Sequence, residues 1–422
     1  MKRIFIFLLC MALILTGTGC SHISTHTREK HPLSLHIAAS FSNDLAAQTY
    51  QSLSTTFAER YGIQILDNSN LSSDAYVKQI LNDFAAGKEP DVFYFPVDHA
   101  QTLIDNSQIV SLDEIRRRYP QYATTIQDEI LEQTADTHGQ NWCVPVLGSY
   151  QALFCNTKLF EIYGAPLPRT WSDLMQAVAI FKQYNVVPIA AGFLDNTQLW
   201  TDHLILSYGT QEHGVLPIER SDIPHTWNQA LAQLPHLREK KAFPVNVTSL
   251  SHANAQTLFR TQKAAMILDS SNSISLLSSE DPVIALSVPC KAPASGEQHL
   301  IVDFSSGFFI SRKAWENEQL RDAAVHFVMY MSSQEAVSHL VKSGGGYPAL
   351  VRERLATITS DDPLSQSVLD LVATARLHTS LSKRLSRRAW STVCSSAALL
   401  YQGYNSIDRV LDDIIKNNAS PS

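Results

Sequence analysis

The residues of this sequence that could perform catalysis are carboxylates that lie close to apolar segments. The candidates are Asp98, Asp202, Asp269 and Asp303. Two such groups at a suitable separation could act as the acid and the base of a glycoside hydrolase. Each is equally suited to capping a helix, closing a turn or hydrogen-bonding a ligand. Because the sequence gives no distance between these carboxylates, an extracellular hydrolase stays open as an alternative function.

Motifs of nucleotide binding and covalent catalysis are not found in the sequence. Gly344-Gly345-Gly346 lacks the following Lys and Ser or Thr of a phosphate loop, and no Gly-x-Ser-x-Gly occurs. Ser380-x-x-Lys383, Lys342-Ser343-Gly344 and Ser270-Ser271-Asn272 resemble parts of penicillin-binding enzymes, but their order along the chain is reversed. We therefore assign no catalytic residue, expect no cofactor, and expect the protein not to be an enzyme.

Cysteine and histidine spacing gives no support for a metal site or a disulfide framework. After the N-terminal segment the cysteines are Cys143, Cys155, Cys290 and Cys394, with no Cys-x-x-Cys pair. An extended chain would separate Cys143 from Cys155 by roughly 40 Å, which is too far for a disulfide bond. We therefore expect no metal.

The length, composition and charge of the chain limit the classes of protein to which it can belong. The chain of 422 residues is 45% hydrophobic, has a net charge of −7, and is long enough for two or three units of about 150 residues. Nucleic-acid binding would need a clustered basic face. The short basic run from Lys383 to Arg388 is typical of a solvated helix face. We expect no nucleic-acid partner.

The N-terminus has the pattern of an export signal. Lys2 and Arg3 precede the apolar run 4–15, and small residues lead to Cys20. The cysteine after small residues indicates a bacterial lipobox, although Gly17 replaces the usual apolar residue. This predicts a signal peptide (1–19), lipidation of Cys20 and a flexible tether (20–32). An ordinary secretory signal cleaved nearby is the alternative. We expect a lipid-anchored protein on the cell membrane or outer membrane, facing the periplasm or exterior.

Helices and strands alternate after the tether. Apolar patterns predict strands over 33–39, 63–66 and 92–95, with helices over 45–61 and 76–86 that end at Gly62 and Gly87. Similar alternation recurs between residues 142 and 311, where Thr170 is a suitable N-cap, and the C-terminal part is mainly helical. This pattern predicts an α/β fold with mixed, mostly parallel sheets flanked by helices.

Ligands of open α/β sheets bind beyond the carboxyl ends of the strands. This rule selects Ser40, Phe41, Ser42 and Asn43 after the first strand, and Asp98 after the third. Their hydroxyl, amide and carboxylate groups can donate to or accept from sugar hydroxyls.

Several ordered segments resemble the bacterial extracellular solute-binding family of sugar-binding ABC-importer receptors. The resemblance extends over nearly all of the mature chain. The segments that carry it are Ala85-Ala86-Gly87-Lys88-Glu89-Pro90-Asp91-Val92-Phe93, His138-Gly139-x-x-Trp142-x-Val144-Pro145, Gly164-x-x-x-Pro168-x-Thr170-Trp171-x-Asp173-Leu174, Phe259-Arg260-x-x-Lys263-Ala264-Ala265-Met266 and Gly346-Tyr347-Pro348-Ala349. Gln262 replaces a glycine that is usual in the family. The resemblance implies a two-lobed periplasmic-binding-protein-like fold with three hinge crossovers near 147–150, 264–266 and 310. The expected lobes are 33–148 plus 266–310 and 149–265 plus 311–422.

The resemblance also implies a function and a set of ligand-binding residues. We expect a monomeric receptor that closes on a carbohydrate and delivers it to ABC permease subunits. Glycerol-3-phosphate or a glycerophosphodiester is the alternative ligand, and an adhesin or sensor on the same fold stays open. The expected ligand-binding residues are Ser40, Phe41, Ser42, Asn43, Phe95, Asp98, Ser149, Tyr150, Trp200, Asp269, Ser270, Gly307, Phe308 and Tyr347.

The predicted anchor can be tested by labelling. Cells that express the chain and are grown with radiolabelled palmitate should label the protein, and Cys20→Ala should abolish the label because it removes the acylated thiol. Cys290→Ala serves as a control that should keep the label. Equal labelling of the Cys20→Ala and unmodified chains would contradict the prediction.

Overall fold

The structure is a computed structural model that describes residues 33–41, 44–71, 74–208, 225–277, 282–291, 298–344, 346–355 and 357–418. The predicted signal peptide, the Cys20 anchor and the tether lie outside these ranges, as do Ser42 and Asn43, so these expectations stay predictions. None of the helices within the described ranges is both long and apolar enough to cross a bilayer.

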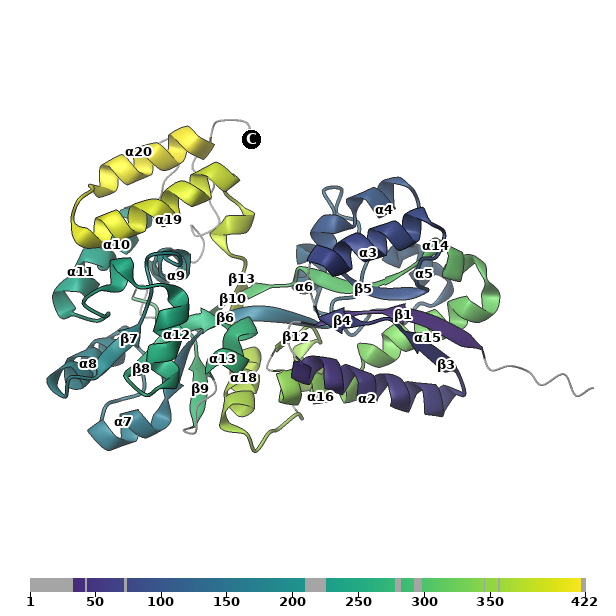
Figure 1. Cartoon of the computed structure of the whole chain (residues 1–422), viewed down its shortest axis with the longest axis horizontal. Helices are drawn as coiled ribbons and strands as arrows, with labels where there is room; N and C mark the ends of the chain where they lie inside the picture. Colours follow the sequence, from purple (N-terminus) through teal and green to yellow (C-terminus); the bar gives the residue numbers. More distant parts are fainter. Residues whose placement is uncertain are drawn as a thin grey trace, which may run out of the picture. The chain divides into compact units, whose positions relative to one another are not determined.

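The first sheet has four strands in the order β11-β5-β1-β3, of which β5, β1 and β3 are labelled in Figure 1. β1 is parallel to both of its neighbours, whereas β11 is antiparallel to β5, so the sheet is mixed. The strands are β1 Ser34–Ala38, β3 Gln64–Asp67, β5 Val92–Pro96 and β11 Ser306–Ile310. Beyond β1, the short β2 (Ser40–Phe41) pairs with β4 (Asn70–Leu71).

Side chains of β5 alternate between the two faces of this sheet. Phe93 packs against Phe84 of α3 (Asp74–Ala85), with ring centroids 5.1 Å apart. Tyr94 instead packs against Phe308 of β11, with centroids 4.9 Å apart, and Phe308 contacts Phe327 of α15 (Glu318–Met331). Each face of the sheet is therefore covered by a different helix.

Helices cover both faces of the first sheet. α15 contacts β1 and β11, and it packs beside α2 (Asp44–Tyr61) and α16 (Gln334–Gly344). Gly62 and Gly87 follow α2 and α3 with φ of 63° and 68°, which confirms both predicted helix ends. The shorter helices of this part are η1 Val97–His99, α4 Gln101–Asp105, α5 Leu112–Arg118, α6 Asp128–Gln133, α14 Arg312–Glu316 and α17 Arg352–Leu355.

The second sheet is built around β6 (Leu147–Asn156). Its path is β13-β10-β6-β8-β7, and β9 and β12 also pair with β6. The pairs of β6 with β8, β9, β10 and β12 are antiparallel, whereas β7–β8 and β10–β13 are parallel. The strands are β7 Val187–Ala190, β8 Ala264–Ser270, β9 Val283–Leu286, β10 His299–Asp303, β12 Tyr347–Pro348 and β13 Arg376–His378. The sheet is mixed as predicted, but the pairs around β6 depart from the expected mostly parallel order.

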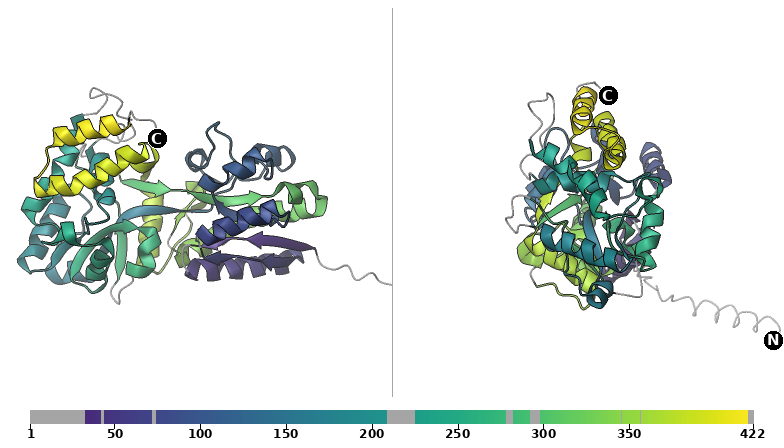
Figure 2. Two further views of the ribbon diagram at one scale, coloured as in Figure 1. Left: turned by 45° about the horizontal axis from the view of Figure 1, so that its top comes forward. Right: turned by 90° about the vertical axis from the view of Figure 1, so that its left-hand side faces the viewer.

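Helices pack around the second sheet. α8 (Trp171–Gln183) starts at the predicted N-cap Thr170, whose side chain forms a reciprocal capping box with Asp173. α19 (Arg387–Gln402) and α20 (Ile407–Asn418), yellow in Figure 2, lie side by side. The others are α7 Thr157–Tyr163, α9 Gln198–Tyr208, α10 His225–Leu231, α11 Gln233–Lys240, η4 Val247–Ser249, α12 His252–Arg260, η5 Ser271–Ser273, α13 Ile274–Leu277, α18 Pro363–Thr374 and η6 Leu381–Lys383.

Strand pairing distributes the chain between the sheets differently from the predicted lobe ranges. β8, β9 and β10, which we expected mainly in the first lobe (266–310), pair in the second sheet. α15, expected in the second lobe, contacts β1 and β11 of the first sheet. The chain returns to the first sheet between Asp303 and Ser306 rather than near 264–266, because β8 pairs with β6 and β7 of the second sheet.

The core of the first sheet can be tested at Phe93, which is fully buried among Phe84, Phe95 and Phe309. Phe93→Ala should lower the free energy of unfolding by about 3–5 kcal/mol, because it leaves a cavity between β5, β11 and α3. Urea unfolding monitored by circular dichroism measures this loss. Tyr404→Ala, at a side chain that is 79% exposed, should change the value by less than about 0.5 kcal/mol. Equal effects of the two changes would contradict the assigned core.

Candidate functional site

Two segments of the chain that connect the first sheet with the second, here called links, lie next to each other. On the first link, Val144 forms a bridge with Phe308 of β11 shortly before β6 begins at Leu147. On the second, β10 ends at Asp303 and β11 begins at Ser306. Ser149 of β6 is the pairing partner of Asp303. All of these residues belong to the one compact unit that the described residues form from Ser34 onward. A site at this meeting point can therefore take side chains from both sheets.

Gly148 allows the two links to approach each other closely. A Cβ atom at this position would lie 2.8 Å from the carbonyl oxygen of Asp303 and 2.8 Å from the ring of Phe304. Neither the backbone nor the buried ring can withdraw cheaply, so a residue without a side chain is required here.

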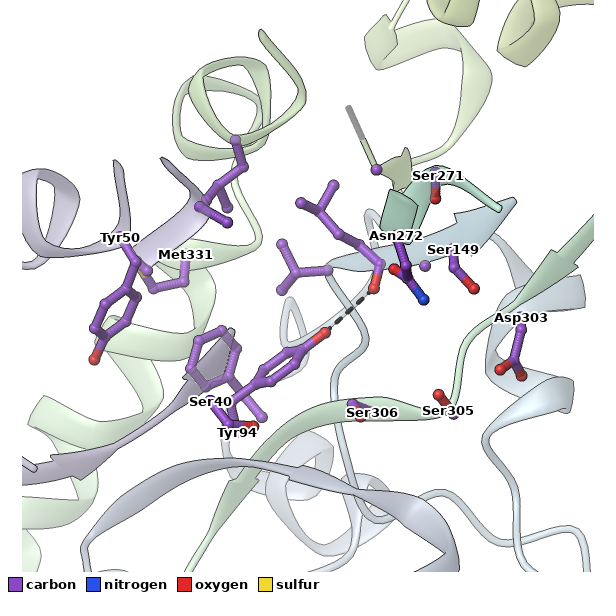
Figure 3. A pocket seen from close by; sticks show the side chains of 17 residues that line it. Ser40, Tyr50, Tyr94, Ser149, Ser271, Asn272, Asp303, Ser305, Ser306 and Met331 are labelled. Carbon is purple, nitrogen blue, oxygen red and sulfur yellow. Dashed lines mark hydrogen bonds between the residues drawn. The ribbon is translucent and has the colours of Figure 1, made fainter. Parts of the chain in front are cut away.

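A cavity of about 240 Å³ opens at this meeting point (Figure 3). Polar groups from both sheets line it, among them Ser40, Tyr94, Ser149, Asn272 and Asp303. The other lining residues are Ala46, Tyr50, Val146, Leu147, Gly148, Ser271, Ser305, Ser306, Phe308, Met331, Leu340 and Gly346. The wall thus combines hydroxyl, amide and carboxylate groups with apolar side chains, a composition typical of small-molecule sites.

Tyr94 connects β5 with the start of β6 across this cavity. Its hydroxyl donates a hydrogen bond to the carbonyl oxygen of Leu147 at 3.2 Å, drawn as a dashed line in Figure 3. Burial raises the pKa of the phenol, so the group is a neutral donor at physiological pH. Its ring supplies an aromatic surface in the cavity wall.

A second cavity of about 380 Å³ shares Ser149 and Asp303 with the first. It lies on the side of the second sheet and includes Gln151 of β6, Asp202 of α9 and Trp390 of α19. The remaining lining residues are Asn196, Gln198, Leu199, His252, Asp269, Ser270, Ser273, Ile301, Val302, Ser380, Ser382 and Lys383. Because two residues belong to both walls, we treat the cavities as one candidate site.

Two carboxylates of the second cavity are buried and hydrogen-bonded. Asp269, 2% exposed, accepts a hydrogen bond from Gln256 Nε2 at 2.9 Å through Oδ2, which also lies 2.9 Å from His252 Nε2. Asp202, 1% exposed, accepts the backbone N–H of Leu381 at 3.2 Å. Such bonds offset the desolvation of a buried charge. The bond to Leu381 also fixes the segment that carries Lys383.

Lys383 is a cation close to carboxylates from both sheets. Its Nζ lies 3.6 Å from Asp303 Oδ1 at the end of β10, and 3.8 Å from Asp98 Oδ2 in η1. All three side chains are exposed to solvent, Asp98 the most, so each ion pair contributes little to stability. Lys383 lines the second cavity, whereas Asp98 lines neither cavity.

The structure brings several predicted ligand-binding residues together. Ser40, Ser149 and Phe308 line the first cavity, and Ser149, Asp269 and Ser270 line the second. Phe41 lies in β2 next to Ser40.

Other predicted residues line neither cavity, so their contact with a ligand stays a prediction. On β6, Ser149 and Gln151 line the second cavity, so Tyr150 points to the opposite face and is 1% exposed. Phe95 shares the buried cluster of Phe93. The remaining three are Trp200 and Tyr347, both buried, and Gly307, where a Cβ would lie 2.6 Å from Cys143 Sγ.

Sequence reasoning missed Tyr94, Asn272, Lys383 and Trp390. Tyr94 lies between Phe93 and Phe95 in the sequence. Because side chains alternate along a strand, its position could have predicted that it faces the other side of the sheet from these two rings. Lys383 and Trp390 come from a segment that follows both sheets in the chain, and no local pattern marks them as part of the site.

Neither metal ligands nor disulfides are found at the site. Within the described ranges, no group of three or more His, Cys, Asp or Glu side chains could hold a metal ion. Cys143, Cys155 and Cys394 are free thiols. Burial raises the pKa of the Cys143 thiol to about 12, so it is not a thiolate at physiological pH.

Solved structures share this fold. A probable secreted solute-binding lipoprotein from Streptomyces coelicolor has a TM-score of 0.75 at 17% identity, over 93% of this chain and 100% of that chain. The solute-binding protein RafE in complex with raffinose has a TM-score of 0.65 at 14% identity, over 92% and 99%. MalE from Bdellovibrio bacteriovorus bound to maltotriose has a TM-score of 0.60 at 14% identity, over 92% and 98%. These likenesses confirm the predicted fold class.

The family follows from the sequence itself. No curated protein sequence matches the chain. The family model described as bacterial extracellular solute-binding protein matches residues 42–337, well over half of the chain. This family consists of receptors rather than enzymes, in agreement with the resemblance found in the sequence. The chain belongs to the bacterial extracellular solute-binding protein family.

Proposed function

We propose that the chain is the extracytoplasmic receptor of an ABC importer, that it binds a carbohydrate in the joined cavities, and that it delivers this ligand to the permease. The observation that carries the proposal is the composition of the cavity walls. Hydroxyl, amide and carboxylate groups such as Ser149, Asn272 and Asp303 lie there together with the rings of Tyr94 and Trp390.

This combination suits the surface of a sugar. A pyranose presents hydroxyl groups around its edge and an apolar C–H face, so it needs both hydrogen-bonding groups and aromatic surfaces. Two of the solved relatives were determined with raffinose and with maltotriose bound. Two cavities that share Ser149 and Asp303 also give room for a ligand longer than a single ring.

The two-lobe division is part of the same proposal. We assign the elements that pack on the first sheet to one lobe and those on the second sheet to the other, and the links at Val146–Ser149 and Asp303–Ser306 to the hinge. Bending at these links would close the lobes on a ligand. Lipidation of Cys20 would hold the receptor, acting as a monomer, at the membrane surface.

The charges of the site give less support to the alternative ligand, glycerol-3-phosphate or a glycerophosphodiester. A phosphate group is bound by Arg, Lys or a row of backbone N–H groups. Among the residues that the structure describes, the lining of the joined cavities contains three aspartates and one lysine, and no arginine.

A thermal-shift screen of the purified full chain tests carbohydrate binding. Raffinose, maltotriose, cellotriose, glucose and glycerophosphodiesters should be compared over a range of concentrations. A sugar at 100 times its Kd stabilises the folded state by about 2.7 kcal/mol, which raises Tm by several degrees. The sugar should be recovered unchanged by chromatography. Stabilisation by glycerophosphodiesters with no effect of any sugar would contradict the proposal.

Replacing the aromatic ring of Trp390 tests whether the sugar binds in the second cavity. Trp390→Leu should weaken binding of the best sugar about tenfold, because the change removes an aromatic surface from the second cavity. Isothermal titration calorimetry measures Kd directly and separates this loss from any change in stability. Trp315→Leu is the matched control, since Trp315 is also partly buried but lines neither cavity. An unchanged Kd for Trp390→Leu would place the ligand elsewhere.

A further inference from the structure

One ring nitrogen of His252 is engaged by the protein, and the other is available to a ligand. The side chain lines the second cavity and is 16% exposed. Its Nε2 atom lies 2.9 Å from Asp269 Oδ2. In the described part of the chain, no hydrogen bond or ion pair involves the Nδ1 atom. Nδ1 is therefore the atom through which this ring can contact a molecule in the cavity.

Asp269 determines which ring nitrogen carries the proton. Its Oδ2 atom also accepts a hydrogen bond from Gln256 Nε2 at 2.9 Å, and its Oδ1 atom accepts the backbone N–H of Ser270 at 2.7 Å. An ionised carboxylate can only accept hydrogen bonds, so a neutral His252 ring carries its proton on Nε2. The Nδ1 atom then has a lone pair and is a hydrogen-bond acceptor. Asp269 is 2% exposed and bonded through both oxygens, which suits it to holding the ring.

The backbone of His252 is also held in place. This residue is the first of α12, and Ser251 caps the helix by accepting the N–H of Asn254. The N–H of His252 donates to Asp195 Oδ1 at 2.7 Å. At Gly192 the chain passes so close to the start of α12 that a Cβ atom would lie 2.4 Å from the carbonyl oxygen of Ser251. The ring thus has a fixed position and a fixed proton, as expected of a preorganised binding group.

A fixed acceptor selects the kind of group that can lie against it. A sugar hydroxyl can donate a hydrogen bond to Nδ1, whereas an ether oxygen and the oxygens of a phosphate diester can only accept. Ser149 and Ser270 line the same cavity, but a serine hydroxyl can rotate to donate or to accept and so distinguishes less well between these groups. An acceptor facing an acceptor is unfavourable, and such contacts give specificity.

We propose that His252 is a specificity-determining residue of the sugar site, that its Nδ1 atom accepts a hydrogen bond from a free hydroxyl group of the ligand, and that Asp269 is a positioning residue that holds the ring in the Nε2–H tautomer. This inference rests on the proposed carbohydrate function and names one contact of that site. Asp269, which we expected to contact the ligand, then acts through His252.

Nitrogen NMR of the full chain, with isotope-labelled histidines, tests the tautomer before any sugar is added. Protonated and unprotonated ring nitrogens resonate far apart, and the signals of His252 are identified by their loss in His252→Asn. At about pH 8, above the ordinary pKa range of histidine, we expect a proton on Nε2 and none on Nδ1. A proton on Nδ1 would overturn the proposal.

Addition of sugar tests the contact. Maltotriose, raffinose and cellotriose are the probes, each at saturation. A bound sugar should move the Nδ1 resonance towards that of a protonated nitrogen, because Nδ1 accepts a hydrogen bond from a hydroxyl group. In calorimetry, His252→Phe should weaken binding of the same sugar about tenfold. His252→Asn should recover part of this loss, since an amide oxygen can accept near the place of Nδ1. His236→Phe is the matched control, because His236 is partly exposed and lines neither cavity.

Asp269→Asn tests the positioning role. An amide at this position can donate to Nε2, so we expect a proton on Nδ1 in part or all of the molecules, together with severalfold weaker sugar binding. The NMR signature separates this role from a purely structural one, which would leave the tautomer as it is. An Asp269→Asn chain with the original tautomer and an unchanged Kd would contradict the assigned role.

The outcomes separate this inference from the function on which it rests. If a sugar binds but neither shifts the Nδ1 resonance nor loses affinity in His252→Phe, the inference is overturned while carbohydrate binding stands. If no sugar binds, or if only glycerophosphodiesters bind, both are overturned. Should His252→Phe not fold, the Nδ1 resonance of the unmodified chain decides. The Nε2–H tautomer, the shift of Nδ1 and the tenfold loss together support the proposal.

Discussion

The site depends on the close contact between the two links that join the sheets. At Gly148, β6 passes so near to Asp303 and Phe304 that a methyl group would lie 2.8 Å from a carbonyl oxygen. This contact places Ser149 opposite Asp303 and gives both cavities a common wall. In the proposed two-lobe arrangement these links form the hinge, so the proposed ligand contacts and the proposed lobe movement involve the same few residues.

Charge and hydrogen bonding then divide the site into two parts. The first cavity has mainly hydroxyl groups, an amide and the ring of Tyr94, whose raised pKa keeps it a neutral donor. The second has the buried carboxylates Asp202 and Asp269; His252 lies against Asp269, and Lys383 lies against Asp303.

The fold was largely predictable from local patterns. Apolar alternation and the glycines at 62 and 87 located β1, α2, α3 and β5, because these features act over a few residues. The lobe boundaries were not predictable in this way. β8 joins the second sheet through its pairing with β6, a contact between segments more than 100 residues apart, and no local pattern encodes it. The rule that ligands bind beyond strand ends selected Ser40, which lines the first cavity, whereas Ser149 and Asp269 were expected from the resemblance to the family. Tyr150 and Tyr347, also expected from the resemblance, line neither cavity, because the face to which a strand residue points depends on register.

The central claim is that the ligand binds at the contact between the two links. A crystal structure of the full chain grown with the tightest sugar of the screen tests this most directly. We expect an intact sugar in both cavities, within hydrogen-bonding distance of Ser149 and Asp303 and stacked on Trp390 or Tyr94. A sugar bound outside these cavities, or a cleaved sugar in them, would contradict the account.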